Sequence, residues 1–228
     1  METPRQQARR QTMADIVRLG REQLATATPA ELSLRAIARD LGLVSSAIYR
    51  YVKDRDELLT LLIVDAYDEL GEEVEAAVAQ TADRPGRERL LALGRALRAW
   101  ALREPSRFAL LYGTPVPGYT APSERTNDPG TRVAVALMGI VEQAWTAGRL
   151  TAPDDDLPDD VSEDMERLRQ EYGLTLPPLV LARGIGLWSA LVGAVAFEVH
   201  EHLGADTLTD PAAFFDAHLN TLIDTLGW

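Results

Sequence analysis

The sequence predicts an all-α protein of 228 residues. Two observations support this prediction. Apolar residues recur at spacings of three, four and seven along most of the chain, and no stretch shows the strict alternation of a half-buried strand. Proline and glycine clusters separate the periodic stretches, as expected for loops between helices. The length allows one or two domains, and we expect a division into segments 1–55 and 56–228.

The first segment predicts three helices in close succession. The first helix ends around residues 26–29, in a stretch that contains proline. Ser33 is a good N-cap for the second helix, and Gly42 ends it. A short third helix is expected over residues 45–51. Asp54 can then cap a long fourth helix, which runs to about Gln80.

Five further helices and two long loops are expected in the second segment. The predicted helices cover residues 87–103, 105–112, 131–148, 179–203 and 211–226. A loop is expected over residues 113–130, which contain four prolines and three glycines. A second, acidic loop is expected over residues 149–164.

Composition excludes several classes of protein. The chain has no cysteine, which rules out disulfides, thiolate metal sites and a cysteine nucleophile. The N-terminal residues are polar and show no secretory signal. The most apolar uncharged stretch, residues 184–197, is shorter than the ~20 residues that span a bilayer. We therefore expect a cytoplasmic protein.

Charge is distributed unevenly along the chain. The net charge is −12, yet residues 1–60 hold 10 basic and 8 acidic side chains, and residues 61–228 hold 13 and 27. A slightly basic N-terminal segment on an acidic body lets one end of the molecule approach a polyanion. The single lysine of the chain, Lys53, lies in that segment, and Arg5, Arg9 and Arg10 could form a basic arm there.

The segment from Ser33 to Leu59, SLRAIARDLGLVSSAIYRYVKDRDELL, has the pattern of a helix-turn-helix. Two short helices meet at a glycine turn, and the second presents small residues at its N-terminal end, where they allow close approach to base edges in a major groove. Hydroxyl and cationic side chains follow, which suit backbone phosphates. The candidate DNA-binding residues are Ser33, Arg35, Ser45, Ser46, Ala47, Tyr49, Tyr51, Lys53 and Arg55.

This segment resembles the DNA-binding domain of the tetracycline-repressor (TetR) family. The resemblance rests on spacing as well as residue type, at Ile37-Ala38, Leu41-Gly42, Ile48-Tyr49-Arg50-Tyr51-Val52 and Leu58-Leu59. Val44 departs from the family pattern, which often has a Ser or Thr cap at the start of the third helix, and Ser45 is the alternative cap. Val52 replaces the more usual Phe at a packing position.

The C-terminal half resembles, less specifically, the WHG-type ligand-binding subgroup of that family. The matching stretches are residues 105–119 and 188–198, with Val192 where the subgroup has its histidine. The resemblance implies an N-terminal three-helix DNA-binding domain and a larger helical ligand-binding and dimerisation domain. The last two helices of each chain would form a four-helix bundle, with close approach allowed at Gly186, Ala190, Gly193 and Ala194.

The function implied is that of a ligand-responsive transcriptional regulator, in the form of a repressor. A homodimer would bind a pseudo-palindromic operator through two recognition helices about one turn of DNA (~34 Å) or somewhat more apart. An effector would move the helix that starts near Asp54 and so release the DNA. A small apolar or aromatic effector is suggested by Trp100, Phe108, Tyr112, Met138, Trp145 and Trp188, although core packing is the plainer interpretation of each.

No cofactor and no metal site are expected. Glu198 and His202 are spaced i, i+4 and could share an ion, but surface or core positions are the plainer interpretation of His200, His202 and His218. The acidic run that begins at Asp154 does not fit a calcium loop. The alternative classes are an all-helical enzyme, for which the common catalytic motifs are missing, and an interaction module with a degenerate helix-turn-helix. A degenerate module should have lost the cluster of Tyr49, Tyr51 and Lys53, which this chain keeps.

Overall fold

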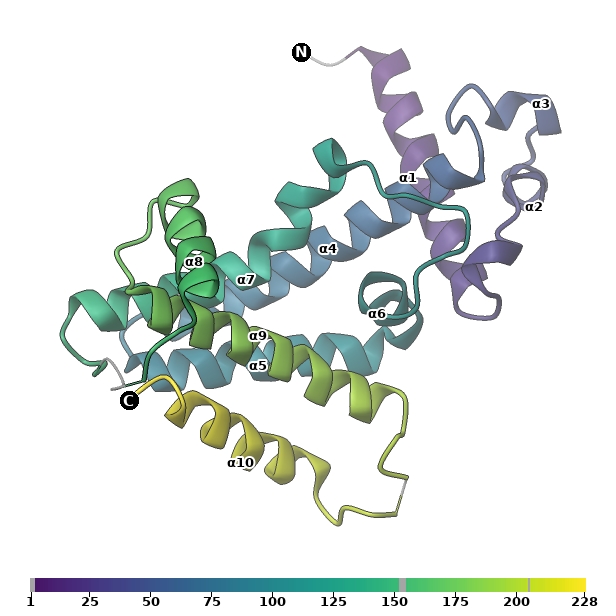
Figure 1. The fold of residues 1–228 in the computed structure, drawn as a ribbon. Helices are drawn as coiled ribbons and strands as arrows, with labels where there is room; N and C mark the ends of the chain where they lie inside the picture. The colour runs from purple at the N-terminus through teal and green to yellow at the C-terminus, as the bar shows by residue number, and fades with distance from the viewer. Residues whose placement is uncertain (1–2, 152–154, 205) are drawn as a thin grey trace. The chain divides into compact units, whose positions relative to one another are not determined.

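The computed structural model describes residues 3–151, 155–204 and 206–228, and within these ranges it contains helices and no strands (Figure 1). The predicted all-α class is confirmed. The chain divides into two compact units: unit 1 comprises residues 1–69 and 104–130, and unit 2 comprises residues 70–103 and 131–228. Two helices, α4 (Arg55–Gln80) and α7 (Ser123–Thr146), belong to unit 1 in their first part and to unit 2 in the remainder.

Unit 1 contains the three predicted N-terminal helices. Its elements are α1 (Pro4–Leu24), a 3-10 turn (Pro29–Glu31), α2 (Leu34–Asp40), α3 (Ser45–Ile48), the start of α4, α6 (Pro105–Tyr112) and the start of α7. The predicted caps form. The Ser33 hydroxyl accepts from the Ala36 amide at 3.3 Å, and the Asp54 carboxylate accepts from the Glu57 amide at 2.9 Å. These bonds satisfy amides that a helix start otherwise leaves unpaired.

The core of unit 1 joins α1 to the helix-turn-helix. Ile16 of α1, Ile37 of α2 and Ile48 of α3 are all fully buried. Gly42 has a φ of 67°, a left-handed conformation that glycine adopts at no steric cost, and this residue turns the chain from α2 into α3. Leu110, Val116 and Tyr119 pack against the same core, so the segment after α6 belongs to this unit.

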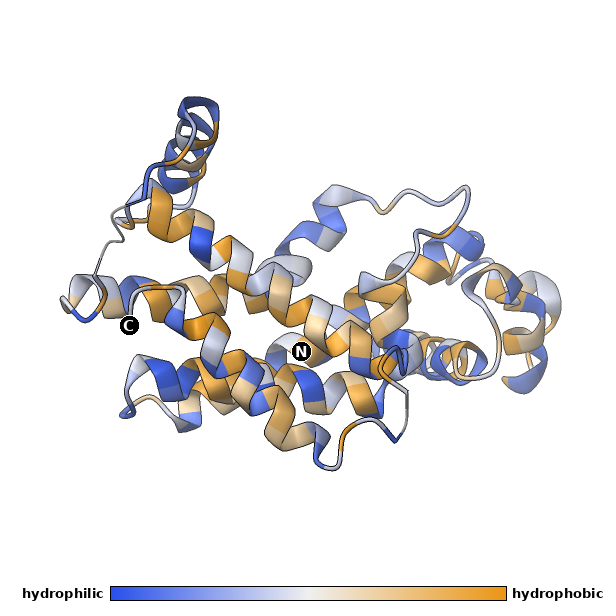
Figure 2. Cartoon of the chain, turned by 60° about the horizontal axis from the view of Figure 1, so that its bottom comes forward, coloured by the Kyte–Doolittle hydropathy of each residue, from blue (hydrophilic) through white to orange (hydrophobic). Residues whose placement is uncertain are grey.

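Unit 2 contains the remainder of α4 and α7 together with α5 (Gly86–Arg103), α8 (Asp159–Glu171), α9 (Pro178–Val199) and α10 (Pro211–Asp224). Helix α5 packs on α9 and α10, and α8 packs on α9. At Gly94 of α5, a Cβ would collide with a Leu219 methyl group, so any larger residue at this helix crossing would require Leu219 to shift. Figure 2 shows α8 as mostly hydrophilic, whereas the other helices of unit 2 mix apolar and polar residues.

Both predicted loops are wrong in part. Helix α7 begins at Ser123, although residues 113–130 were expected to be irregular. Pro129 lies inside its second turn, where it removes only one helical hydrogen bond, and Arg125 ties the first turn to Glu57 with contacts of 2.8 and 3.0 Å. The contact between Arg125 and Glu57, which are distant in sequence, therefore stabilises the start of α7, where the local proline and glycine content disfavours a helix.

The acidic stretch predicted as a loop over residues 149–164 is helical from Asp159 onward, as the start of α8. This helix buries none of its residues, and its few apolar side chains, Val161, Met165 and Leu168, are outnumbered by charged ones, which is why the acidic stretch resembled a loop. It is supported by Asp159 and Asp160 in its first turn and by pairs one turn apart, including Arg169 with Glu166 at 2.6 Å. The start of the acidic run, residues 152–154, lies outside the described residues.

Candidate nucleic-acid interface

Helix α3, the second helix of the helix-turn-helix, begins directly after Val44. Val44 occupies the N-cap position without a side-chain cap bond, and its carbonyl accepts from the Ala47 amide at 2.8 Å. The alternative cap, Ser45, is therefore excluded, because Ser45 is already the first helical residue. The side chains of Ser45 and Ser46 are exposed, and Ala47 is half-buried. Both hydroxyls thus lie on the surface at the end of the helix that a major groove would receive.

The chain leaves α3 in a tight turn that presents one tyrosine and buries part of the next. The Tyr51 amide donates to the Ile48 carbonyl at 2.9 Å, and the Tyr49 side chain is 48% exposed. Tyr51 is half-buried against the core of unit 1. The Arg9 guanidinium lies 5.4 Å from the Tyr51 ring centroid, and its Nη1 donates to the Arg50 carbonyl at 3.4 Å.

Arg9 of α1 therefore contacts the turn of residues 49–51 that follows α3. The sequence did not indicate this contact. Arg5, Arg9 and Arg10 belong to the first turns of helix α1 rather than to an extended arm. The cationic side chains after the turn have acidic neighbours. Lys53 Nζ is exposed and 3.9 Å from Asp54, whereas Arg55 is half-buried and donates to Asp56 at 3.0 and 3.2 Å.

The start of α2 is held by a residue that sequence reasoning missed. The Gln23 side-chain oxygen accepts from the Ser33 amide at 2.9 Å, and its nitrogen donates to the Ser33 carbonyl at 3.3 Å. The Ser33 hydroxyl oxygen accepts one bond in capping α2, and its O–H is still able to donate a hydrogen bond. Arg35, the second residue of α2, is exposed. No local pattern signals the Gln23 contact, because the two residues lie on separate elements.

A network of ion pairs joins α1, α4 and α6 within unit 1. Arg107 of α6 has a side chain only 4% exposed, and it contacts Asp65 at 3.0 Å and Glu69 at 2.9 Å. Arg21 of α1 binds the same two carboxylates, at 2.5 and 3.1 Å. Glu104 lies 3.5 Å from Arg107. Although burial alone would lower it, the pKa of Arg21 is raised by its hydrogen bond and charge contacts with Asp65 and Glu69.

The six candidate effector residues fall in both units. Trp100, Met138, Trp145 and Trp188 belong to unit 2, and Phe108 and Tyr112 belong to unit 1. Trp100 and Phe108 are fully buried, and the other four are half-buried. Within unit 1, the Phe108 and Tyr112 rings are 5.2 Å apart, and Tyr67 contacts Tyr112 edge-on at 6.1 Å. Burial raises the pKa of Tyr112 and of Tyr67.

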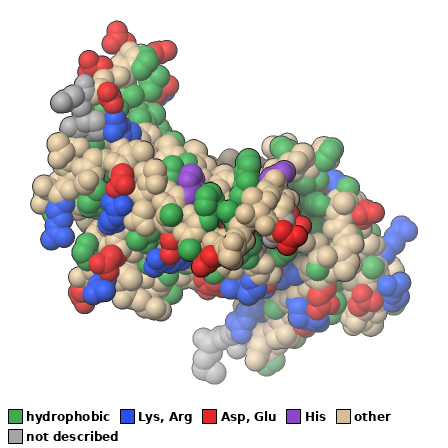
Figure 3. Space-filling model, turned by 90° about the horizontal axis from the view of Figure 1, so that it is seen from below, with side chains coloured by type: hydrophobic (Ala, Val, Ile, Leu, Met, Phe, Trp, Pro, Cys, Tyr) green, Lys and Arg blue, Asp and Glu red, His purple; other side chains and the backbone are tan. Residues whose placement is uncertain are grey.

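Unit 2 exposes an apolar face on its last two helices. By length and composition α9 is apolar enough to cross a membrane, but a single such helix is weak evidence for that. Among the described residues, a Cβ at Gly186 or Gly193 would meet no atom within 4 Å apart from its chain neighbours and the backbone of its own helix. Phe197 of α9 and Phe214 of α10 are 54% and 49% exposed. Figure 3 shows hydrophobic side chains gathered on this face beside two histidines.

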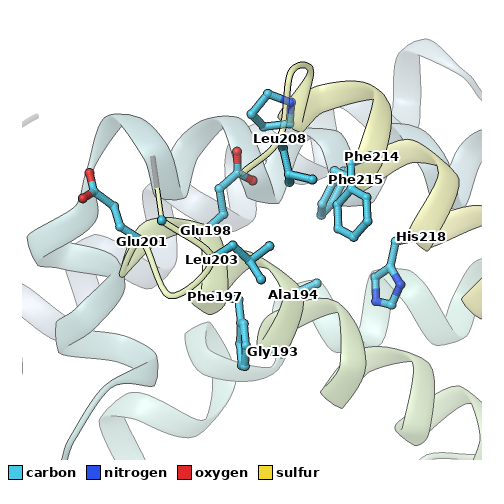
Figure 4. A pocket seen from close by; sticks show the side chains of 12 residues that line it. Gly193, Ala194, Phe197, Glu198, Glu201, Leu203, Leu208, Phe214, Phe215 and His218 are labelled. Carbon is cyan, nitrogen blue, oxygen red and sulfur yellow. The ribbon is translucent and has the colours of Figure 1, made fainter. Parts of the chain in front are cut away.

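The same face is hollowed where α9 and α10 meet. A recess of about 430 Å³ is lined mainly by apolar residues, among them Ala194, Phe197, Leu203, Phe214 and Phe215 (Figure 4). Glu198 at its edge is held by Arg98, and His218 stacks on Phe214 with ring centroids 6.2 Å apart. Within the described part of the chain, no three His, Asp or Glu residues are grouped to hold a metal ion.

An all-helical chain with a helix-turn-helix on one unit and an exposed apolar helix pair on the other has the architecture of a one-component transcriptional regulator. A family model described as "Tetracyclin repressor-like, C-terminal domain" matches residues 90–222. The chain is 47% identical to the HTH-type transcriptional regulator Rv1816 of Mycobacterium tuberculosis, over 98% of this chain and 95% of that protein. The same values hold for the regulator Mb1846 of Mycobacterium bovis.

Solved structures of regulatory proteins share the fold of this chain. The regulatory protein SCO4313 has a TM-score of 0.79 and 35% identity, with 97% of this chain and 100% of that one covered. The fold is also shared with the regulator FadR of Bacillus subtilis, at a TM-score of 0.60 and 15% identity, with 94% and 97% covered. The chain belongs to the TetR family of transcriptional regulators, and its relatives are named as regulators rather than enzymes.

Proposed function

We propose that this regulator is a repressor that binds a pseudo-palindromic DNA operator as a homodimer and is released by a small apolar or aromatic effector. The observation that carries the proposal is the exposed N-terminal end of α3, where Ser45 and Ser46 lie ahead of Tyr49 and Lys53. Hydroxyls at this end suit base edges and phosphates, and the tyrosine and lysine suit phosphates. Ser33, Arg35, Ala47, Tyr51 and Arg55 complete the proposed DNA-binding set. A cytoplasmic location follows from that role.

The homodimer is proposed on the apolar face of α9 and α10. The outward residues Gly186 and Gly193 meet nothing in their own chain, and they are spaced to allow a second helix to approach closely. Phe197 and Phe214 leave about half of their surface exposed beside the recess of Figure 4. A two-fold axis through this face would bury the two glycine positions and the two phenylalanines of each chain together, and it would form a four-helix bundle.

Effector control is proposed to act through the ion-pair network of unit 1. The chain passes between the units at three places, after residues 69, 103 and 130. Inside unit 1, Glu69 and Glu104 at two of these places both contact Arg107. At the third, Gly130 lies so near Tyr67 that a Cβ would stand 3.3 Å from the ring. A change in unit 2 that is transmitted at the first two places would therefore reach the Arg107 cluster, which Arg21 connects to α1.

The effector is proposed to be held by aromatic residues of unit 2, with Trp145 and Trp188 as the leading candidates because both are only half-buried. Trp100 and Met138 of unit 2, and Phe108 and Tyr112 of unit 1, are the remaining candidates. The FadR structure was solved in complex with stearoyl-CoA, so a protein of this fold can hold a ligand with a long apolar part. Effector and DNA must then weaken each other's binding reciprocally.

Selection of DNA from a random pool tests the proposal directly. Purified protein is mixed with random duplexes, and the retained DNA is sequenced through several rounds. We expect an inverted repeat whose half-sites lie about one helical turn (~34 Å) or somewhat more apart. The control is a variant with Ser45, Ser46 and Tyr49 replaced by alanine, which leaves the core intact and should enrich no repeat. Enrichment of the same repeat by both proteins, or of none by the wild type, would contradict the proposal.

A further inference from the structure

The recognition helix begins with an apolar side chain that contributes nothing visible to folding. Val44 is 72% exposed, the highest fraction among the large hydrophobic side chains of the described residues. Its neighbour Leu43 packs partly against the core of unit 1, whereas Val44 points away from that cluster. It occupies the N-cap of α3 with a φ of −65° and a ψ of 139°, and it offers no side-chain bond to the helix.

Valine at this position is unfavourable for the isolated protein in two ways. An N-cap position strongly prefers Ser, Thr, Asp or Asn, whose side-chain oxygens satisfy a helix amide, and valine has no such oxygen. The two methyl groups are also left in water, where apolar surface is not stabilised. A position that departs from local rules without gain to the fold is a candidate for function.

The chemistry around Val44 indicates what those methyl groups contact. Val44 directly precedes Ser45 and Ser46, the exposed residues at the end of α3 that the proposed DNA complex places in the major groove. Only thymine presents a methyl group in that groove, and apolar side chains recognise it by contact. Because valine is β-branched, its methyl groups are held in few orientations and lose little freedom on contact.

We propose that Val44 is a specificity-determining residue that selects thymine in each operator half-site by contact with the C5-methyl group. The inference rests on the proposed operator binding, and it adds a direct base preference that the serine hydroxyls and the phosphate contacts do not supply. Burial of one methyl-sized group corresponds to roughly a fourfold change in affinity, which sets the scale expected for each half-site.

The test uses operator duplexes in which single thymines are replaced by deoxyuridine, which removes the methyl group and leaves the hydrogen-bonding groups unchanged. For the wild-type protein, we expect one symmetric pair of replacements to weaken binding by roughly fourfold per half-site. Val44→Ser should bind the thymine and deoxyuridine duplexes equally. The same variant should melt at a higher temperature than the wild type, because the serine hydroxyl can cap α3.

For Val44→Ser, the expected loss of affinity for the thymine duplex and the expected rise in melting temperature have opposite signs. This separates recognition from folding, since a merely structural role would lower both the affinity and the melting temperature. Val135→Ser is the matched control, because Val135 is 51% exposed and lies in unit 2. It should keep the full response to deoxyuridine. If the wild type selects an operator but binds every deoxyuridine duplex as well as the thymine one, the role of Val44 is wrong while operator binding stands. If the wild type selects no operator, both fail.

Discussion

The two units of this protein differ in how the side chains at their helix contacts are partnered. In unit 1, charged groups complete one another within the chain: Arg107 is almost buried and contacts Asp65, Glu69 and Glu104. In unit 2, α9 and α10 leave Phe197 and Phe214 half exposed beside open glycine positions. Unit 1 therefore pairs its buried charges within one chain, whereas unit 2 leaves apolar surface exposed at the face where we propose that a second copy binds.

The largest effect should follow from breaking the buried network of unit 1. Arg107→Met leaves three carboxylates, Asp65, Glu69 and Glu104, with one arginine partner fewer, and we expect the free energy of unfolding to fall by about 3 kcal/mol. Arg95→Met is the control, since its contact with Asp216 at 2.7 Å is largely exposed and should contribute about 0–1 kcal/mol. Denaturant unfolding of both variants measures the difference, and equal losses would show that burial does not distinguish the two pairs.

The proposed dimer should be the next most sensitive feature. Gly193→Leu adds a large side chain where this chain has open space, so the monomer should fold normally and a close helix partner should be displaced. We expect the dimer dissociation constant to rise about tenfold to hundredfold, the range of a 1–3 kcal/mol overpacking penalty. Sedimentation across a dilution series measures it, with Gly139→Leu on α7 as the control. A wild-type dilution profile for Gly193→Leu would place the interface elsewhere.

A smaller effect is expected at the DNA surface itself. Tyr49→Ala removes one hydroxyl proposed to bind a phosphate, which corresponds to roughly a tenfold loss of affinity. Since phosphates carry no sequence information, the loss should be similar for the selected operator and for its single-base variants. Anisotropy titrations against that set provide the measurement. A loss confined to one base pair would mean that Tyr49 reads a base.

The smallest effect should be a local response of α8 to acid. Hydrogen bonds from Arg169 and then Gln170 lower the pKa of Glu166 to about 2 from an ordinary value of 4.5. The pairing therefore supports α8 above pH 4.5 and is lost as the pH falls from 4.5 toward 2. As the pH falls from 4.5 toward 2, hydrogen exchange of the α8 amides should become faster relative to the intrinsic exchange rate at each pH. Glu166→Gln should remove the response, and an unchanged response would assign it to other carboxylates.

The sequence predicted the elements whose signals are local. Ser33, Gly42 and Asp54 mark ends that the structure confirms, and the spacing between them defined the helix-turn-helix. Contacts between distant residues could not be predicted in this way. Arg107 meets Asp65 from 42 positions away, and no periodicity in either helix indicates that pairing.

The errors have equally specific causes. Helix α8 has no buried residue, and its three apolar side chains, Val161, Met165 and Leu168, are sparse within a strongly acidic stretch that resembled a loop. Helix α7 begins before Pro129 because Arg125 is anchored on α4 by Glu57. The sequence left the cap of α3 open between Val44 and Ser45, and the backbone geometry places Val44 there.

We propose above that α3 reads a specific DNA sequence. Anisotropy titration of the protein against the selected duplex and a scrambled duplex, each at two salt concentrations, tests this proposal. We expect strong preference for the selected duplex, with binding to both duplexes weakened at the higher salt because phosphate contacts release counterions. Equal affinity for the two duplexes at both salt concentrations would contradict sequence-specific recognition by α3.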